Sequence, residues 1–280
     1  MKRILIPTDF SECANTAFNA GIEIAQKFNA EVDILHIINS AYDWVELPLN
    51  LEKYHPETRK EIAEARGKIT ELIIKAKKIN VKANEFIVYN KSYHGIIEHC
   101  QKYNNDLLIM GTYGSKGVKK IIGSHTLHVL KHSEIPALSV KKDFRITNLN
   151  QLTFASDFEN PNPEMINLLK EFSRKFNLKI NLLYVNTPLH FEDSTISTKK
   201  MKAITSQYLF ENYSQTIYNS FSVQEGILKF NEGTNSLTII EYHQTSRIEN
   251  IFNPNVTEYL LNYTSALLAF PDPEYVLSHK

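Results

Sequence analysis

Short apolar runs alternate along the chain with segments in which apolar residues return every three or four positions. In the first half, the short runs are RILIP (3–7), EVDILHI (31–37), NEFIVY (84–89), DLLIM (106–110) and ALSV (137–140). Runs of this kind are typical of parallel strands that are buried on both faces of a sheet. The pattern therefore predicts a five-stranded parallel sheet for the first half.

The segments between these strands have the period of amphipathic helices. The first helix is predicted to begin after Ser11, a favourable N-cap residue, and the second near Pro56. Residues 93–103 and 124–132 supply two further helices, whereas residues 41–60 lack an apolar period and are predicted to form a surface loop that carries the single tryptophan. Strands that alternate with helices in this way predict a doubly wound α/β fold.

The chain contains an internal repeat. Residues 4–39 align without a gap to residues 152–187, with eight identical positions, and residues 106–140 align to residues 236–270. The first offset is 148 residues and the second is 130, so the second copy has lost 18 residues between the two blocks. A repeat of this length predicts two copies of one fold rather than a single larger domain.

Two α/β domains are therefore predicted, at residues 1–143 and 149–280. The third helix of the second copy is predicted to shrink to ILKFNEG (227–233), which would account for much of the deletion. The strands expected in this copy are LTFA (152–155), KINLLYV (179–185), SFSV (220–223), LTII (237–240) and LLAF (267–270).

Composition and charge narrow the range of partners. The chain is 42% hydrophobic and 22% charged, as in a globular protein, and its 31 basic residues balance 31 acidic ones. The chain has no overall positive charge, so binding to nucleic acid is not favoured. No apolar stretch approaches the roughly 20 residues that span a membrane. A cytoplasmic location is expected. Cys13 and Cys100 are predicted to be core thiols, and no spacing of histidines, cysteines and carboxylates predicts a metal site.

A glycine-rich segment, GTYGSKGVKKIIGSHT (111–126), joins the fourth strand to the fourth helix. Glycine allows a backbone to approach a ligand closely, and free N–H groups at a helix start attract anions. The segment matches neither the phosphate-binding loop (P-loop) of nucleoside triphosphatases nor the GxGxxG pattern of dinucleotide-binding folds. In doubly wound sheets, ligands bind beyond the carboxyl ends of the strands, where this segment is expected to meet PTDF (7–10) and INS (38–40).

These motifs resemble the universal stress protein family in its tandem form. The resemblance rests on PTD (7–9) after the first strand, the GTxG that begins at Gly111, the GS at 123–124 and the final IPALSV (135–140). It implies two tandem Rossmann-like domains of the HUP type, packed as a pseudo-twofold pair. It also implies ATP or another adenine nucleotide, with Mg²⁺ as a further expected ligand, in the first domain.

By the same resemblance, the glycines and the serine would hold the phosphates, Asp9 would approach the adenosine, and the backbone after the second strand would meet the adenine. Eight residues separate Gly114 from Gly123, one fewer than in the family pattern. The nucleotide-binding residues expected on this basis are Pro7, Thr8, Asp9, Ile37, Ile38, Met110, Gly111, Gly114, Gly123, Ser124 and His125.

The second copy lacks the glycine segment. Glu241, Gln244, Asn253 and Pro254 occupy the positions of the three glycines and Ser124, so no nucleotide is expected there. Loss in one copy suggests that the turn alone does not require the glycines, which favours a ligand role in the other copy. Asp157 persists in the second copy, so its counterpart, Asp9, is open to two interpretations, a ligand contact or a residue of a local turn.

The resulting hypothesis is a stress-response or regulatory protein that binds an adenine nucleotide in its first domain. The sequence offers no identifiable catalytic base, so at most slow ATP hydrolysis is expected. The alternative is a ligand-free scaffold that acts through protein–protein interaction. In either case the final strands, ALSV and LLAF, are expected to pair within the chain, and assembly into a homodimer stays open. A third hypothesis is an enzyme that acts on a small phosphorylated ligand.

Overall fold

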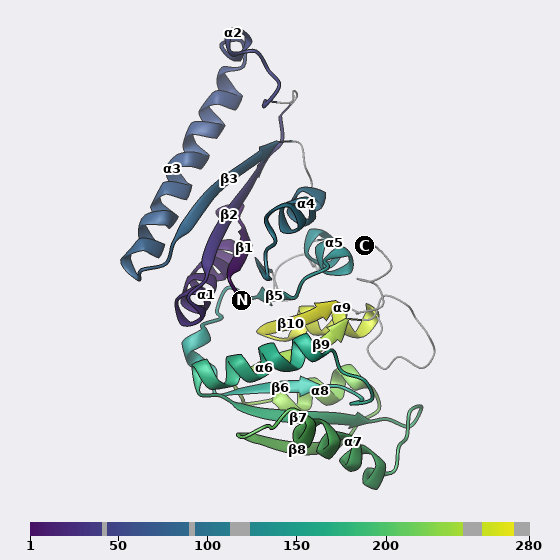
Figure 1. Cartoon of the computed structure of the whole chain (residues 1–280). Coiled ribbons are helices and arrows are strands. Elements are labelled where there is room, and N and C mark those ends of the chain that lie inside the picture. Colours follow the sequence, from purple (N-terminus) through teal and green to yellow (C-terminus); the bar gives the residue numbers. More distant parts are fainter. Residues whose placement is uncertain (41–43, 90–92, 113–123, 243–253, 272–280) are drawn as a thin grey trace.

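The described residues form one continuous sheet that runs through the whole molecule (Figure 1). This computed structural model describes all residues except 41–43, 90–92, 113–123, 243–253 and 272–280. The ten strands lie in the order β3-β2-β1-β4-β5-β10-β9-β6-β7-β8. The first half of the chain thus supplies one side of the sheet, from β3 to β5, and the second half supplies the other.

The first half follows the predicted alternation of strands and helices, and α1 begins directly after Ser11, whose Oγ accepts a hydrogen bond from the backbone N–H of Ala14. A short helix, α2, lies within the expected loop. The elements are β1 (Arg3–Pro7), α1 (Glu12–Phe28), β2 (Glu31–Ile38), α2 (Leu49–Glu52), α3 (Pro56–Lys78), β3 (Ala83–Tyr89), α4 (Tyr93–Tyr103), β4 (Leu107–Gly111), α5 (Ser124–His132) and β5 (Ala137–Val140).

A 3₁₀ turn at Ile146–Asn148 leads into the second half, which repeats the pattern without a counterpart of α2 among the described residues. The limits of the two domains, 1–143 and 149–280, remain predictions. The elements are β6 (Gln151–Ala155), α6 (Pro163–Phe176), β7 (Lys179–Asn186), α7 (Ser194–Gln207), β8 (Tyr213–Asn219), α8 (Val223–Asn231), β9 (Ser236–Tyr242), α9 (Pro254–Tyr263) and β10 (Ala266–Pro271).

The two halves meet at β5 and β10, as expected for the final strands. Within each half the neighbouring strands are parallel. β5 and β10 instead pair antiparallel, with Val140 opposite Ala266 and Ala137 opposite Ala269. The structure therefore confirms two tandem α/β units, each with a five-stranded parallel sheet, joined as a pseudo-twofold pair.

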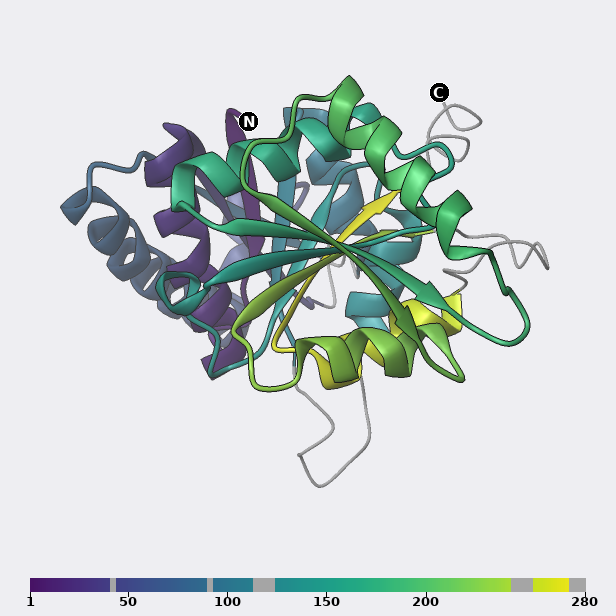
Figure 2. The same cartoon turned by 90° about the horizontal axis from the view of Figure 1, so that it is seen from below.

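Helices cover both faces of the sheet, which explains the continuous apolar strands. Buried side chains of α1, α3, α6 and α7 pack on one face, and those of α4, α5, α8 and α9 pack on the other. Figure 2 shows these layers on either side of the strongly twisted strands. On the first face the halves also touch through α1 and α6, where the ring centroids of Phe28 and Phe172 are 5.1 Å apart. The core is thus continuous across the junction.

The structure corrects the expected third strand of the second half. SFSV (220–223) is not a strand; it forms the turn that leads into α8, and the strand is β8, just before it. β8 lies at the edge of the sheet and pairs with β7 alone, so only one of its edges is covered. An edge strand tolerates the polar residues of YSQTIYN, which is why its apolar signal is weak.

The predicted location of the 18-residue deletion in the second half is also wrong. The third helices of the two halves, α4 and α8, have 11 and 9 residues and differ little. The large differences lie earlier, because α3 has 23 residues and α7 has 14. In addition, the connection before α3 covers residues 39–55, whereas the connection before α7 covers only residues 187–193.

Two further expectations concern the core and the membrane. Cys13 and Cys100 are buried free thiols, which confirms their assignment as core residues. Burial raises the pKa of the Cys100 thiol to about 12. Within the described ranges, no helix has the length and apolar character that a membrane span requires.

Candidate functional site

The carboxyl ends of three neighbouring strands, β2, β1 and β4, lie side by side at one edge of the sheet. Pro7 at the end of β1 is opposite Leu35 of β2, and Leu5 of β1 is opposite Leu108 of β4. The chain leaves β1 for β2 on one side, whereas β4 lies on the other side, so this is the switch point of the first half. It is the edge at which a doubly wound sheet offers room for a ligand.

A tight turn follows β1 at Thr8, Asp9 and Phe10. Thr8 Oγ1 accepts a hydrogen bond from the N–H of Phe10 at 3.0 Å, and Asp9 Oδ1 accepts one from the N–H of Ser11 at 2.9 Å. Phe10 adopts the left-handed region with φ of 63°. The two side-chain hydrogen bonds stabilise this turn and set the start of α1.

The second half contains the same turn at Ser156, Asp157 and Phe158. Ser156 Oγ accepts from the N–H of Phe158 at 3.0 Å, Asp157 Oδ1 accepts from the N–H of Glu159 at 3.0 Å, and the φ of Phe158 is 59°. The structure thus gives the aspartate a turn-forming role in both halves. Contact between Asp9, which is exposed, and a ligand stays a prediction.

His36 on β2 ties this turn to the neighbouring strand. Its Nδ1 lies 2.7 Å from the carbonyl oxygen of Thr8, so the ring donates through Nδ1, and its centroid is 4.5 Å from that of Phe10. Since both contacts are structural, His36 positions the end of β1. Sequence analysis did not identify this role, because no local spacing links His36 to Thr8.

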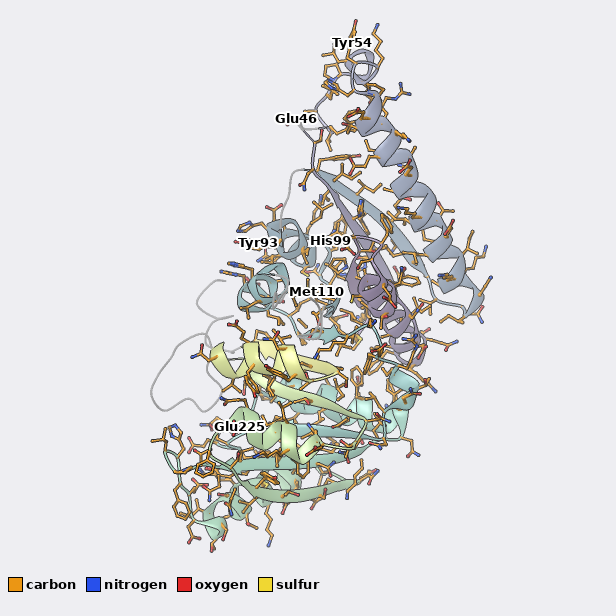
Figure 3. All side chains as sticks on the ribbon, turned by 180° about the vertical axis from the view of Figure 1, so that it is seen from behind. Glu46, Tyr54, Tyr93, His99, Met110 and Glu225 are labelled. Carbon is orange, nitrogen blue, oxygen red and sulfur yellow. The ribbon has the colours of Figure 1, made fainter. Side chains whose placement is uncertain are left out.

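The expected contacts on β2 and β4 have side chains that face the core. Ile38 is fully buried and packs against Ile62 and Ala65 of α3, and Met110, labelled in Figure 3, is 8% exposed. A ligand at this edge would therefore meet the backbone of Ile38 rather than its side chain. That agrees with the backbone role that the resemblance implied for the end of the second strand.

Gly111, at the end of β4, lies against the first turn of α1. A Cβ at this position would come 2.7 Å from the backbone nitrogen of Ala14 and closer still to the carbonyl group of Cys13. Close packing alone therefore requires glycine here. This changes the interpretation of Gly111, because its retention in the first half needs no ligand as an explanation.

The second half shows how Glu241 replaces this glycine. α1 begins five residues after the end of β1, whereas α6 begins only at Pro163, eight residues after the end of β6. The shorter helix leaves space for the side chain of Glu241, which is 7% exposed. In the first half, the early start of α1 is therefore what makes glycine necessary at position 111.

The remaining expected residues are described only in part. Ser124 and His125 form the first turn of α5, as predicted, although their side chains lie outside the described residues. Gly114 and Gly123 also lie outside the described residues. The expectation that these four residues contact the nucleotide is therefore untested by the geometry.

The described part of the site contains neither an activated nucleophile nor a metal cluster. Burial raises the pKa of the Cys13 thiol, and the nearby carboxylates of Glu12 and Asp9 raise it further, so the thiol stays protonated at neutral pH. Among the described residues, no three histidine, cysteine or carboxylate side chains are grouped as a metal site.

A buried polar network in the first half lies away from this edge. The Asp33 side chain on β2 is fully buried, and its carboxylate accepts hydrogen bonds from Asn84 at 2.9 Å and Asn105 at 3.0 Å. His99 Nε2 lies 3.4 Å from the carboxylate, and Arg3 Nε lies 3.5 Å from it. Because the partners of Asp33 come from segments far apart in the sequence, no local sequence motif predicts this network.

Comparison with known proteins places these features in a family. The model of the universal stress protein family matches residues 1–141. Universal stress protein MJ0531 of Methanocaldococcus jannaschii is 32% identical over 144 residues, which cover 50% of this chain and 82% of that protein. Universal stress protein MJ0577 of the same organism is 29% identical over 154 residues, which cover 50% of this chain and 95% of that protein.

The resemblance in fold extends over both halves. The crystal structure of a universal stress protein from Archaeoglobus fulgidus superposes with a TM-score of 0.74, at 18% sequence identity, over 96% of this chain and 98% of that one. At this identity the match shows the fold alone.

Proposed function

Because the chain belongs to the universal stress protein family, we propose that its first half binds ATP or another adenine nucleotide at the carboxyl ends of β1, β2 and β4. The observation that carries the proposal is the meeting of three elements at the switch point: the Thr8–Asp9 turn, the backbone at Ile38 and the exit of β4 towards the glycine segment. This is where mononucleotides bind in doubly wound folds.

Each part of the nucleotide has a partner of suitable chemistry in this arrangement. The backbone at Ile37 and Ile38 offers peptide groups to the base, and the exposed carboxylate of Asp9 offers an acceptor to the ribose hydroxyls. The glycine segment and the start of α5 offer N–H groups to the phosphates. Mg²⁺ would arrive with the phosphates, since it keeps phosphate and water ligands and needs few protein groups.

The second half is proposed to bind no nucleotide in the equivalent place. Glu241 brings a carboxylate to the position of Gly111, and like charge disfavours phosphate in a confined site. The whole protein is then a cytoplasmic regulatory or stress-response protein with one nucleotide site and at most slow ATP hydrolysis.

The pairing of β5 with β10 favours a second candidate function, that of a ligand-free scaffold. This pairing completes a ten-stranded sheet, so the two halves would present one continuous unit to a protein partner. In this alternative the turn after β1 and Gly111 serve the fold alone.

Calorimetric titration of the full chain with Mg-ATP distinguishes the two functions. Binding is expected to be lost in Gly123→Val and unchanged in Asn253→Val, which alters the equivalent position of the second half. The absence of heat and of any thermal shift at about 1 mM nucleotide, the weak end of specific affinity, would overturn the nucleotide proposal and leave the scaffold. Equal losses in both variants would contradict the assignment to the first half.

A further inference from the structure

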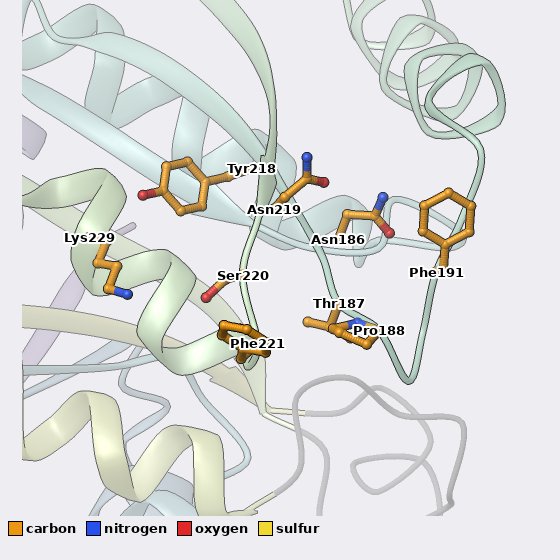
Figure 4. A pocket seen from close by; sticks show the side chains of 9 residues that line it. All are labelled: Asn186, Thr187, Pro188, Phe191, Tyr218, Asn219, Ser220, Phe221 and Lys229. Atoms are coloured by element: carbon orange, nitrogen blue, oxygen red, sulfur yellow. The ribbon is translucent and has the colours of Figure 1, made fainter.

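The second half contains a cavity of about 440 Å³ at the carboxyl ends of β7 and β8 (Figure 4). Cavities of roughly 300–1,000 Å³ are the usual size for small-molecule sites. In the order of the strands, it lies towards the opposite end of the sheet from the proposed nucleotide site, near the edge strand β8. Its lining residues are Asn186, Thr187, Pro188, Phe191, Tyr218, Asn219, Ser220, Phe221 and Lys229.

Exposed aromatic side chains flank this cavity. Phe191 is 76% exposed and Phe221 is 87% exposed, although each has a large apolar surface. Figure 4 shows that they project from two different segments, on either side of Thr187 and Pro188, while Tyr218 contributes a third ring from β8. Rings that line a concave site in this way favour a planar aromatic occupant.

The wall formed by the segment after β7 is held by hydrogen bonds. Asn186 Oδ1 accepts a hydrogen bond from the N–H of Glu192 at 3.0 Å, and Asn186 Nδ2 donates one to the carbonyl of Glu192 at 3.3 Å. Thr187 pairs with His190 in a short antiparallel bridge. Since Asn186 and Thr187 are also buried, this wall is preformed rather than created by a ligand.

The cavity carries a positive charge, and no carboxylate is among the described residues that line it. Lys229 is the only ionisable residue with a charge at neutral pH among the nine that line the cavity, and it forms no ion pair with any residue that the structure describes. In Figure 4 its ammonium group points towards the hydroxyl of Ser220. A cation beside a hydroxyl donor is a suitable pair for a carboxylate group.

The first half supplies a contrast at the equivalent place. A cavity of about 430 Å³ beside β3 and α4 is lined by His99, at the position of Lys229. Its charged lining residues are Glu46, Glu98 and Lys102 (Glu46 and His99 are labelled in Figure 3). His99 there faces the buried carboxylate of Asp33.

In the second half the counterpart of Asp33 is Asn181, a neutral residue whose Oδ1 accepts a hydrogen bond from Ser214. The second half therefore has a lysine, with no ion pair to a described carboxylate, where the first half has a histidine beside one. The described lining of this cavity thus has one lysine and no carboxylate, whereas the lining of the first-half cavity has two carboxylates beside Lys102.

We propose that this cavity binds a small planar aromatic carboxylate. The ring lies among Phe191, Tyr218 and Phe221, and the carboxylate accepts hydrogen bonds from Lys229 and Ser220. Binding here is independent of the proposed nucleotide site, which lies in the other half.

The test compares two probes of the same shape on the ¹⁵N-labelled full chain by nuclear magnetic resonance. 4-Hydroxybenzoate carries the charge, and 4-hydroxybenzyl alcohol lacks it. The carboxylate is expected to shift the amide signals of Asn219, Ser220 and Phe221, and the alcohol is expected to bind about fivefold more weakly, as for one partly exposed ion pair. Equal affinity of the two probes, or shifts confined to other residues, would overturn the proposal.

Variants assign the charge and the rings separately. Lys229→Gln is expected to lower the affinity for 4-hydroxybenzoate to that for the alcohol, whereas Phe221→Ala weakens both probes. Lys179→Gln is the matched control, because Lys179 is exposed at the opposite end of β7. An unchanged affinity in Lys229→Gln, or a stronger response of the same amides to adenosine monophosphate than to 4-hydroxybenzoate, contradicts the proposed ligand class.

Discussion

Gly111→Ala tests the close approach of β4 to α1, on which the geometry of the candidate site depends. The added Cβ would lie 2.7 Å from the nitrogen of Ala14, whereas ordinary van der Waals contact begins at 3.4 Å, so the backbones must separate by at least 0.7 Å. Both partners are backbone, which cannot rotate away as a side chain does. Overpacking of this kind costs about 1–3 kcal/mol, and we expect a value near the upper end.

The measurement is equilibrium unfolding in urea together with a thermal melt. A loss of about 3 kcal/mol corresponds to a fall in Tm of about 6 °C in a chain of this size. The matched control is Gly67→Ala, because Gly67 is exposed in α3 and an added Cβ there meets nothing within 4 Å. That variant is expected to gain up to about 1 kcal/mol from the higher helix propensity of alanine. The packing argument fails if Gly111→Ala is as stable as the wild type or as Gly67→Ala.

Two other predictions concern buried ionisable groups. Burial by itself would raise the pKa of Asp33, but hydrogen bonds from His99, Asn84 and Asn105 and the charge of Arg3 outweigh it and lower the pKa below its ordinary value of 3.8. The stabilisation by Asp33 is therefore complete above pH 3.8 and is lost as the pH falls below it. Asp33→Asn should lower the free energy of unfolding by about 3 kcal/mol at neutral pH. In urea titrations, the difference in free energy of unfolding between the wild type and this variant should become smaller in acid. A difference that does not change with pH would exclude a charged Asp33. Cys100, with its pKa raised to about 12, should react with thiol reagents only as the protein unfolds, so prompt labelling of the native chain would contradict its burial.

The sequence predicted the fold well where local chemistry determines local structure. Three of the eight identical positions of the two copies, Asp9, Phe10 and Asn29, are residues that turns require. Asn29 and Asn177, from the two KFN runs, both end a helix in the left-handed conformation, with φ of 55° and 53°. The Asp-Phe pairs form the same turn after β1 and β6. Such positions keep their residue type because few side chains fit the backbone.

The sequence was less informative where structure depends on distant partners. β8 lies at an edge, so its burial and hence its apolar pattern are weak, and SFSV (220–223) gave the stronger local signal. The requirement for Gly111 arises from the first turn of α1, about 100 residues earlier in the chain. No local pattern reports such a contact. For Gly111, the comparison of the two copies therefore favoured a ligand role where packing is a sufficient explanation.

The junction between the halves gives the second half a structural role, but it does not explain the cavity of that half. β5 is buried in full because β10 covers its edge, and an uncovered edge would present unpaired peptide groups to solvent. The contact of Phe28 with Phe172 adds a shared core on one face. The elements of the second half that serve the junction are β10, β9 and α6. The cavity instead lies at β7 and β8, beyond β9 and β6 in the order of the sheet, away from the junction of the two halves. Its exposed rings and its lysine, which has no carboxylate partner among the residues that the structure describes, therefore need an explanation other than the pairing of the halves, and the proposed ligand supplies one.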